Sequence, residues 1–226
     1  MKSQSDLLVM KRKKFVYGFF QHHLKTIGSL SVRQECYNRE NLTRITCLPN
    51  RFAMRKYFGS VIHQSHDDDG ILEVVESEGL RSLHFGSESR QSCMLVTDPH
   101  YLQLSYLRAM MGWNLFREGF DQALMIGLGG GSMAKYLLRA FPTGRISAVE
   151  YRRSVVTIAR SHFGLPIDPR LKVIIGDGGH YIQQAAKQQR QYDLLLIVAF
   201  DHDGLSESIN GEAFFDACRS FLSRHG

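Results

Sequence analysis

The sequence has no apolar run close to the roughly 20 residues that a membrane-spanning helix needs, and it has no CxxC pair. Its apolar stretch Leu7–Met10 is too short for a signal peptide, and the basic cluster Lys11–Lys14 follows that stretch instead of preceding it. The four cysteines have neither paired nor zinc-like spacing. We therefore expect a cytoplasmic protein with reduced, structural thiols and no membrane partner.

Acidic and histidine residues do not gather with the spacing of a metal site. His66–Asp69 and Asp201–Asp203 are runs of adjacent residues, and neighbouring side chains on an extended chain point to opposite sides. We interpret both runs as solvated turns and predict no metal site.

The positive charge is unevenly distributed along the chain. The net charge is +6, but residues 1–60 hold 12 Lys and Arg against 3 Asp and Glu, and residues 61–226 hold 16 against 19. A basic arm can bind nucleic acid, yet no nucleic-acid-binding motif accompanies this one. We predict that residues 1–69 form a basic N-terminal extension and that nucleic acid is not a partner.

Residues 70–97 have the pattern of a small β-hairpin region. Ile71–Val75 and Leu80–Phe85 are short β-prone runs separated by the turn-like segment Glu76–Gly79. Asp98 and Pro99 then resemble a helix start, with Asp as the N-cap and Pro in the first turn.

From residue 98 onward the sequence predicts a Rossmann-like domain, 98–226. Short runs rich in Val, Ile and Leu alternate with segments of helical spacing. The expected strands are Ala123–Ile126, Arg145–Val149, Leu171–Ile175 and Leu194–Phe200, and the expected helices are Ser132–Phe141, Val155–Phe163, Tyr181–Lys187 and Glu212–Leu222. This order is typical of an α/β fold, a parallel sheet with helices on both faces.

The sequence stops at Gly226, just after the last expected helix. The apolar fourth strand would then leave a sheet edge uncovered. We expect either a fold truncated at its C-terminus or an edge covered by the N-terminal segment or a second subunit.

A glycine loop follows the first of these strands. Gly127, Gly129 and Gly131 let the backbone turn tightly and approach a ligand, and the next helix presents free N–H groups. Glu150 ends the second strand, where an acid can accept hydrogen bonds from both ribose hydroxyls. The pattern predicts a bound nucleoside.

The third strand ends in Asp177 and Gly178. At that edge of the sheet an Asp followed by Gly can accept a hydrogen bond from an adenine amino group. Three strand ends therefore point to one crevice and predict a site for an adenine nucleoside.

Seven motifs in order make the chain resemble the polyamine aminopropyltransferase (spermidine synthase) family, in particular its bacterial spermidine-synthase-like branch. They are Gln91-Ser92, Asp98-Pro99, Tyr106-Leu107-Arg108-Ala109-Met110-Met111, Gly127-Leu128-Gly129-Gly130-Gly131-Ser132, Ala148-Val149-Glu150, Gly176-Asp177-Gly178 and Ala199-Phe200-Asp201. The resemblance covers about residues 70–226.

The resemblance implies an enzyme that moves an aminopropyl group from decarboxylated S-adenosylmethionine to a diamine or polyamine. It also implies a homodimer, and it assigns Gln91 to the nucleoside or its tail. Tyr106 would contact the amine and Asp201 would be the second acid of an Asp-x-x-Asp segment. Asp203 lies close enough in sequence to assist it.

Two positions depart from the family pattern. Val198 stands where the family has the first acid, which serves as the base, and Gly130 stands where classical members have an acid in the glycine loop. Loss of a general base typically costs about 10²–10⁴ in rate, so impaired aminopropyl transfer is expected. Two alternatives stay open: a methyltransferase that uses S-adenosylmethionine itself, and a non-catalytic nucleoside-binding protein.

Overall fold

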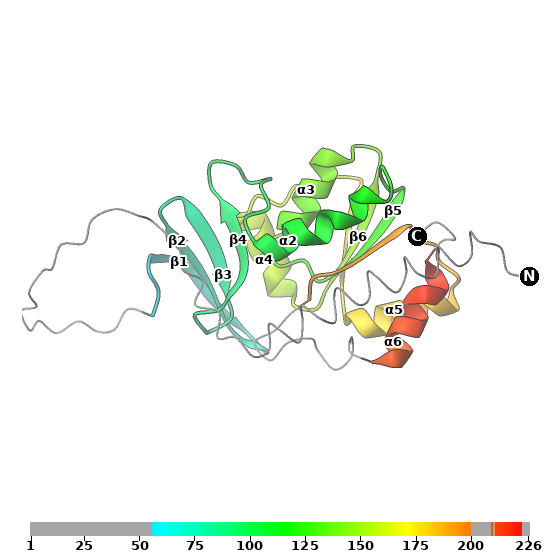
Figure 1. Cartoon of the computed structure of the whole chain (residues 1–226). Coiled ribbons are helices and arrows are strands. Elements are labelled where there is room, and N and C mark those ends of the chain that lie inside the picture. Colours follow the sequence, from blue (N-terminus) through cyan, green and yellow to red (C-terminus); the bar gives the residue numbers. More distant parts are fainter. Residues whose placement is uncertain (1–55, 200–208, 210, 223–226) are drawn as a thin grey trace, which may run out of the picture. The chain divides into compact units, whose positions relative to one another are not determined.

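The computed structural model describes residues 56–199, 209 and 211–222 of the chain (Figure 1). The chain divides into two units, 1–51 and 52–226, and all described residues belong to the second. That unit contains an antiparallel sheet of four strands followed by a parallel sheet of four strands with its helices. The Asp201 and Asp203 predictions, and the basic segment before residue 56, lie outside the described residues.

The antiparallel sheet runs in the order β1-β2-β3-β4. Its strands are β1 (Ser60–Asp67), β2 (Gly70–Ser77), β3 (Leu80–His84) and β4 (Arg90–Leu95). The β2–β3 hairpin is present as predicted. Its two-residue turn places Glu78 at φ 50° and Gly79 at φ 76°, the left-handed pair that a type I′ turn requires.

The sheet extends beyond the predicted hairpin on both sides. β1 lies inside the predicted N-terminal extension, before residue 70, and β4 carries Gln91. β1 is an edge strand whose residues are exposed or only partly buried. It therefore lacks the apolar alternation by which a half-buried strand can be read from sequence.

The prediction that a helix starts at Asp98–Pro99 is wrong. The helix α2 spans Ser105–Met110 and continues as the 3₁₀ helix η1 (Met111–Leu115). Asp98 instead closes a turn, since its Oδ1 accepts from the backbone N–H of His100 at 3.3 Å and its carbonyl from that of Tyr101 at 3.1 Å. Asp and Pro favour turns for the same reasons that they favour helix starts. The dipeptide alone therefore does not distinguish a turn from a helix start.

The parallel sheet runs in the order β7-β6-β5-β8 and confirms the predicted α/β fold. Its strands are β5 (Gln122–Ile126), β6 (Arg145–Glu150), β7 (Leu171–Ile175) and β8 (Leu194–Ile197). Its helices are α3 (Ser132–Ala140), α4 (Arg153–His162), α5 (Gly178–Lys187) and α6 (Glu212–Phe221). β8 ends three residues before the predicted strand end, and Phe200 lies outside the described residues.

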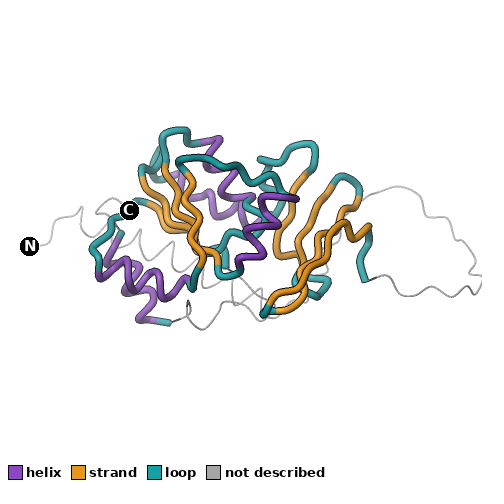
Figure 2. Tube along the Cα trace, turned by 180° about the vertical axis from the view of Figure 1, so that it is seen from behind, coloured by secondary structure: helices purple, strands orange, loops and turns teal. Residues whose placement is uncertain are grey.

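Helices cover both faces of the parallel sheet (Figure 2). Alternate residues of β5 separate the two cores: Ala123 and Met125 pack with α3 and α4, and Leu124 and Ile126 pack with α5 and α6. α4 is shared with the antiparallel sheet, against which it packs Val155. Among the described helices, none is both long and apolar enough to cross a membrane.

Candidate functional site

The glycine loop leaves β5 in conformations that favour glycine. Gly127, Gly129 and Gly131 have φ angles of 89°, 55° and 75°. A Cβ at Gly127 would lie 2.8 Å from the backbone nitrogen of Ala199. The loop is therefore packed backbone to backbone against the segment that follows β8, and side chains are excluded there for steric reasons.

Glu150 is buried at the end of β6 and holds the glycine loop. Its Oε2 accepts from the N–H groups of Leu128 at 2.9 Å and Gly129 at 3.3 Å. Its Oε1 accepts from the N–H of Arg152 at 3.0 Å. A carboxylate has about four acceptor positions, so three are used by the backbone and one remains on Oε1.

Asp177 lies at the next strand end and caps α5. Its Oδ1 accepts from the N–H of His180 at 2.7 Å. The backbone joins this strand end to that of β6, because the N–H of Gly176 donates to the carbonyl of Glu150 at 3.0 Å. A Cβ at Gly178 would lie 2.4 Å from Cγ2 of Ile126, so only glycine allows α5 to begin this close to β5.

Four residues for which the sequence predicts a role or a departure from the family pattern line one small pocket beside the loop. They are Gln91 from β4, Tyr106 from α2, Gly129 from the loop and Val198 after β8. The pocket has a cavity volume of about 20 Å³ and its other lining residues are Ser92, Leu107, Leu128, Ser132 and Met133. None of these described lining residues is acidic.

Tyr106 is the one ionisable side chain in this described lining. Desolvation raises the pKa of its phenol to about 12. The phenol therefore stays protonated near neutral pH. It can donate or accept a hydrogen bond, but it cannot supply a phenolate as a proton acceptor there.

The two positions at which the resemblance predicts a departure from the family pattern have different surroundings. Val198 borders the pocket, and its N–H donates to the carbonyl of Ile126 at 2.8 Å. At Gly130, a Cβ would lie 2.8 Å from both the ring of Phe163 and the hydroxyl of Ser92. Because Phe163 is fully buried, a larger residue at position 130 would force the core to shift.

A partly buried ion pair lies next to Glu150 and was not predicted from the sequence. The guanidinium of Arg152 donates from Nε to Asp67 Oδ2 at 3.1 Å and from Nη2 to the other carboxylate oxygen. It also lies 4.6 Å from the centroid of the Phe85 ring. Its hydrogen bond is the main cause that lowers the pKa of the Asp67 carboxyl below the ordinary value. No local pattern could reveal a pair 85 residues apart in sequence.

Comparison with known proteins decides the family. Residues 103–226, more than half of the chain, match the spermine/spermidine synthase domain. The chain belongs to the spermine/spermidine synthase family. The matched region begins just before α2 and contains the glycine loop, Glu150 and Asp177.

Within that family a curated relative has high similarity. A Neisseria meningitidis serogroup A protein named polyamine aminopropyltransferase is 40% identical over 161 residues, which cover 70% of this chain and 60% of the relative. The chain thus spans about 60% of the length of this relative.

Solved structures agree with the family fold. A spermidine synthase in complex with the transition state analogue AdoDATO has a TM-score of 0.57 and 20% identity, covering 72% of this chain and 55% of that one. Human methyltransferase-like protein 13 in complex with SAH has a TM-score of 0.51 and 28% identity, covering 54% of this chain and 62% of that one. Both comparisons support the Rossmann-like fold.

Proposed function

We propose that the protein transfers an aminopropyl group from decarboxylated S-adenosylmethionine to a diamine or polyamine. The observation that carries this proposal is the 40% identity to a polyamine aminopropyltransferase over 161 residues. The arrangement of Glu150 and Asp177 at adjacent strand ends supports a nucleoside at the carboxyl edge of the sheet.

In this proposal the nucleoside lies across the ends of β5, β6 and β7. One ribose hydroxyl donates to Oε1 of Glu150 without displacing any backbone bond, since that oxygen has one acceptor position left. Asp177 accepts from the adenine amino group with its carboxylate, at the start of α5. Gly129 permits close approach of the ligand to the loop backbone.

The amine in this proposal lies beside Tyr106 and Gln91, with Asp201 and Asp203 as the acids that hold its positive charges. The amine nitrogen must first lose a proton, because an ammonium has no lone pair. Its lone pair then attacks the carbon beside the sulfonium, the carbon–sulfur bond breaks, and its electron pair stays on sulfur as a neutral thioether. Alignment of the two bound substrates supplies much of the rate.

Val198 makes proton removal the weak step of this reaction. The described lining of the pocket offers no carboxylate there, and Tyr106 stays protonated. Val198→Asp is therefore expected to raise aminopropyl transfer by about 10²-fold or more. The assay measures thioether nucleoside release from decarboxylated S-adenosylmethionine with putrescine.

The matched control is Val198→Asn, which has the size of Asp without its charge. An equal gain in both variants, or no gain in either, would contradict the assignment of position 198. Restoring the acid at Gly130 is a poorer test, because Phe163 and Ser92 occupy the space that a side chain needs.

A methyltransferase is the second candidate. The human methyltransferase-like protein 13, whose structure contains SAH, supports it at 28% identity over 54% of this chain. A methyl donor would use the same nucleoside contacts and needs no diamine-binding acid. Release of SAH from S-adenosylmethionine, with no release of thioether from the decarboxylated form, would favour this candidate.

A homodimer and a cytoplasmic location remain predictions.

A further inference from the structure

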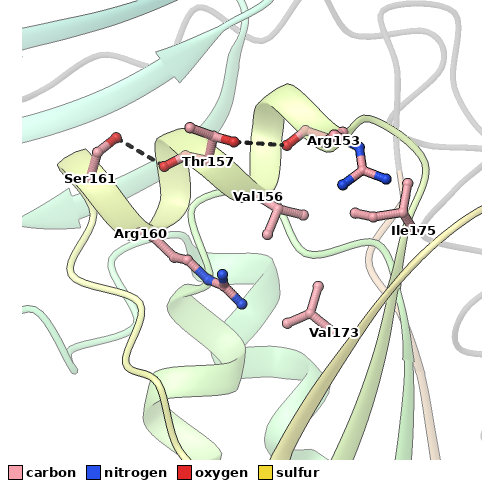
Figure 3. A pocket seen from close by; sticks show the side chains of 7 residues that line it. All are labelled: Arg153, Val156, Thr157, Arg160, Ser161, Val173 and Ile175. Carbon is pink, nitrogen blue, oxygen red and sulfur yellow. Dashed lines mark hydrogen bonds between the residues drawn. The ribbon is translucent and has the colours of Figure 1, made fainter.

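A groove lies between α4 and the edge strand β7 (Figure 3). It has a cavity volume of about 600 Å³. Val156 of α4 and the two β7 residues Val173 and Ile175 form its apolar floor, and Ile175 keeps 38% of its surface exposed. The acids of the candidate nucleoside site, Glu150 and Asp177, do not line this groove.

The rim of the groove is positively charged. Arg153 and Arg160 are exposed, and Figure 3 shows both side chains bordering the groove. Neither guanidinium has an ion pair with any carboxylate of the described part of the chain. The hydroxyls of Thr157 and Ser161 donate to helix carbonyls at 3.3 and 2.9 Å. The rim therefore offers mainly cationic donors to an occupant.

The groove runs along an open strand edge. Within the described residues β7 pairs on one side with β6 and has no strand partner on the other. Such an edge presents unpaired N–H and C=O groups to an incoming strand. Arg153 and Arg160 are seven residues apart on α4, a rise of roughly 10 Å, and about three residues of a β-strand span that distance.

We propose that this groove binds an acidic, extended segment of another protein, which adds to β7 as a strand. Every second residue of a strand lies on the same face, so the side chains on the α4 side of that segment include both kinds. An apolar side chain covers Val156, Val173 and Ile175. Acidic side chains two residues before and two residues after it meet Arg153 and Arg160. Charge complementarity favours this occupant over the chain's own residues 1–60, which carry 12 Lys and Arg against 3 Asp and Glu. The apolar floor and strand edge favour it over nucleic acid.

The test uses the full chain and a fluorescein-labelled eight-residue peptide in which glutamate and valine take turns at every second position and threonine fills the positions between them. Its glutamates and valines therefore share one face of the strand. Fluorescence anisotropy should show saturable binding. Arg153→Glu and Arg160→Glu should each weaken that binding roughly fivefold, because a favourable charge pair becomes a repulsive one. Lys187→Glu, an equal charge reversal on α5 across the sheet, should leave binding unchanged.

Two further peptides separate strand addition from simple charge attraction. The same peptide with alternate amides N-methylated should bind markedly less, since it cannot pair with β7. The peptide with lysine in place of each glutamate should not bind. The proposal is overturned if no binding occurs, if the N-methylated or lysine peptide binds equally well, or if all three charge reversals have the same effect.

Discussion

Lys135 shows at the scale of one residue how burial changes chemistry. It is 2% exposed in α3, and its Nζ donates to the carbonyl of Phe163 at 2.5 Å and lies 3.0 Å from Sδ of Met94. No carboxylate of the described residues pairs with it. Burial lowers the pKa of this ammonium from 10.5 to about 8, so its charge opposes folding at neutral pH.

The lowered pKa of Lys135 predicts how stability changes with pH. Between pH 8 and 10.5 the unfolded chain binds the proton that the folded chain has lost, so stability should rise with pH across that window. Relative to Lys135→Met the gain should reach at most about 3 kcal/mol. Urea unfolding of both proteins at several pH values measures it, and parallel pH profiles would contradict the expected difference.

Residues at strand ends could be predicted because each lies at the end of its own strand or within two residues of it. Gly127, Glu150 and Asp177 needed only the local alternation of strand and helix to be placed at one edge of the sheet. The role of Arg152 could not be predicted in this way, because its partner Asp67 belongs to the antiparallel sheet and is 85 residues away in sequence. Local sequence patterns thus indicate which strand ends form the candidate nucleoside site, but not the side chains from other elements that support them.

At the scale of elements, helices and strands with two apolar faces or a clear apolar stripe were predicted well. β7 has the predicted bounds, and α3 differs by one residue at its end. β1 was missed because an exposed edge strand has no apolar alternation. The helix start at Asp98 was wrong because the same residue types form turns.

The cap of α5 gives a prediction at this scale. Asp177→Ala removes the oxygen that accepts from His180 N–H, and the free energy of unfolding should fall by about 1 kcal/mol. Asp177→Asn keeps an acceptor oxygen and should lose only a few tenths of that amount. The urea midpoints of the two variants measure the cap, and equal losses would show that charge, not capping, stabilises this helix end.

At the scale of the whole described unit, Arg152 joins the two sheets. Its guanidinium contacts the β1–β2 turn through Asp67 and Gly70, and its N–H supports Glu150 in the parallel sheet. The Arg152 side chain is 8% exposed. Removing Asp67 would leave this nearly buried charge with the Gly70 carbonyl at 3.1 Å and a longer contact of 3.9 Å to the exposed carboxylate of Asp69. Loss of the main partner of a buried charge is costly in a protein interior.

A double-mutant cycle tests this junction. Asp67→Asn should lower the free energy of unfolding by roughly 2–3 kcal/mol at neutral pH, and Arg152→Met by a similar amount. The double variant should lose less than the sum of the two. Thermal unfolding of the four proteins gives the coupling energy, and strict additivity would mean that the pair does not hold the sheets together.

The central claim is the proposal that the strand ends at Glu150 and Asp177 bind the nucleoside of an aminopropyl donor. Calorimetric titration of the full chain with decarboxylated S-adenosylmethionine, and separately with S-adenosylmethionine, tests it most directly. We predict saturable binding of both with clear preference for the decarboxylated form. Preference for intact S-adenosylmethionine would contradict aminopropyl transfer in favour of methyl transfer, and binding of neither would contradict the nucleoside site itself.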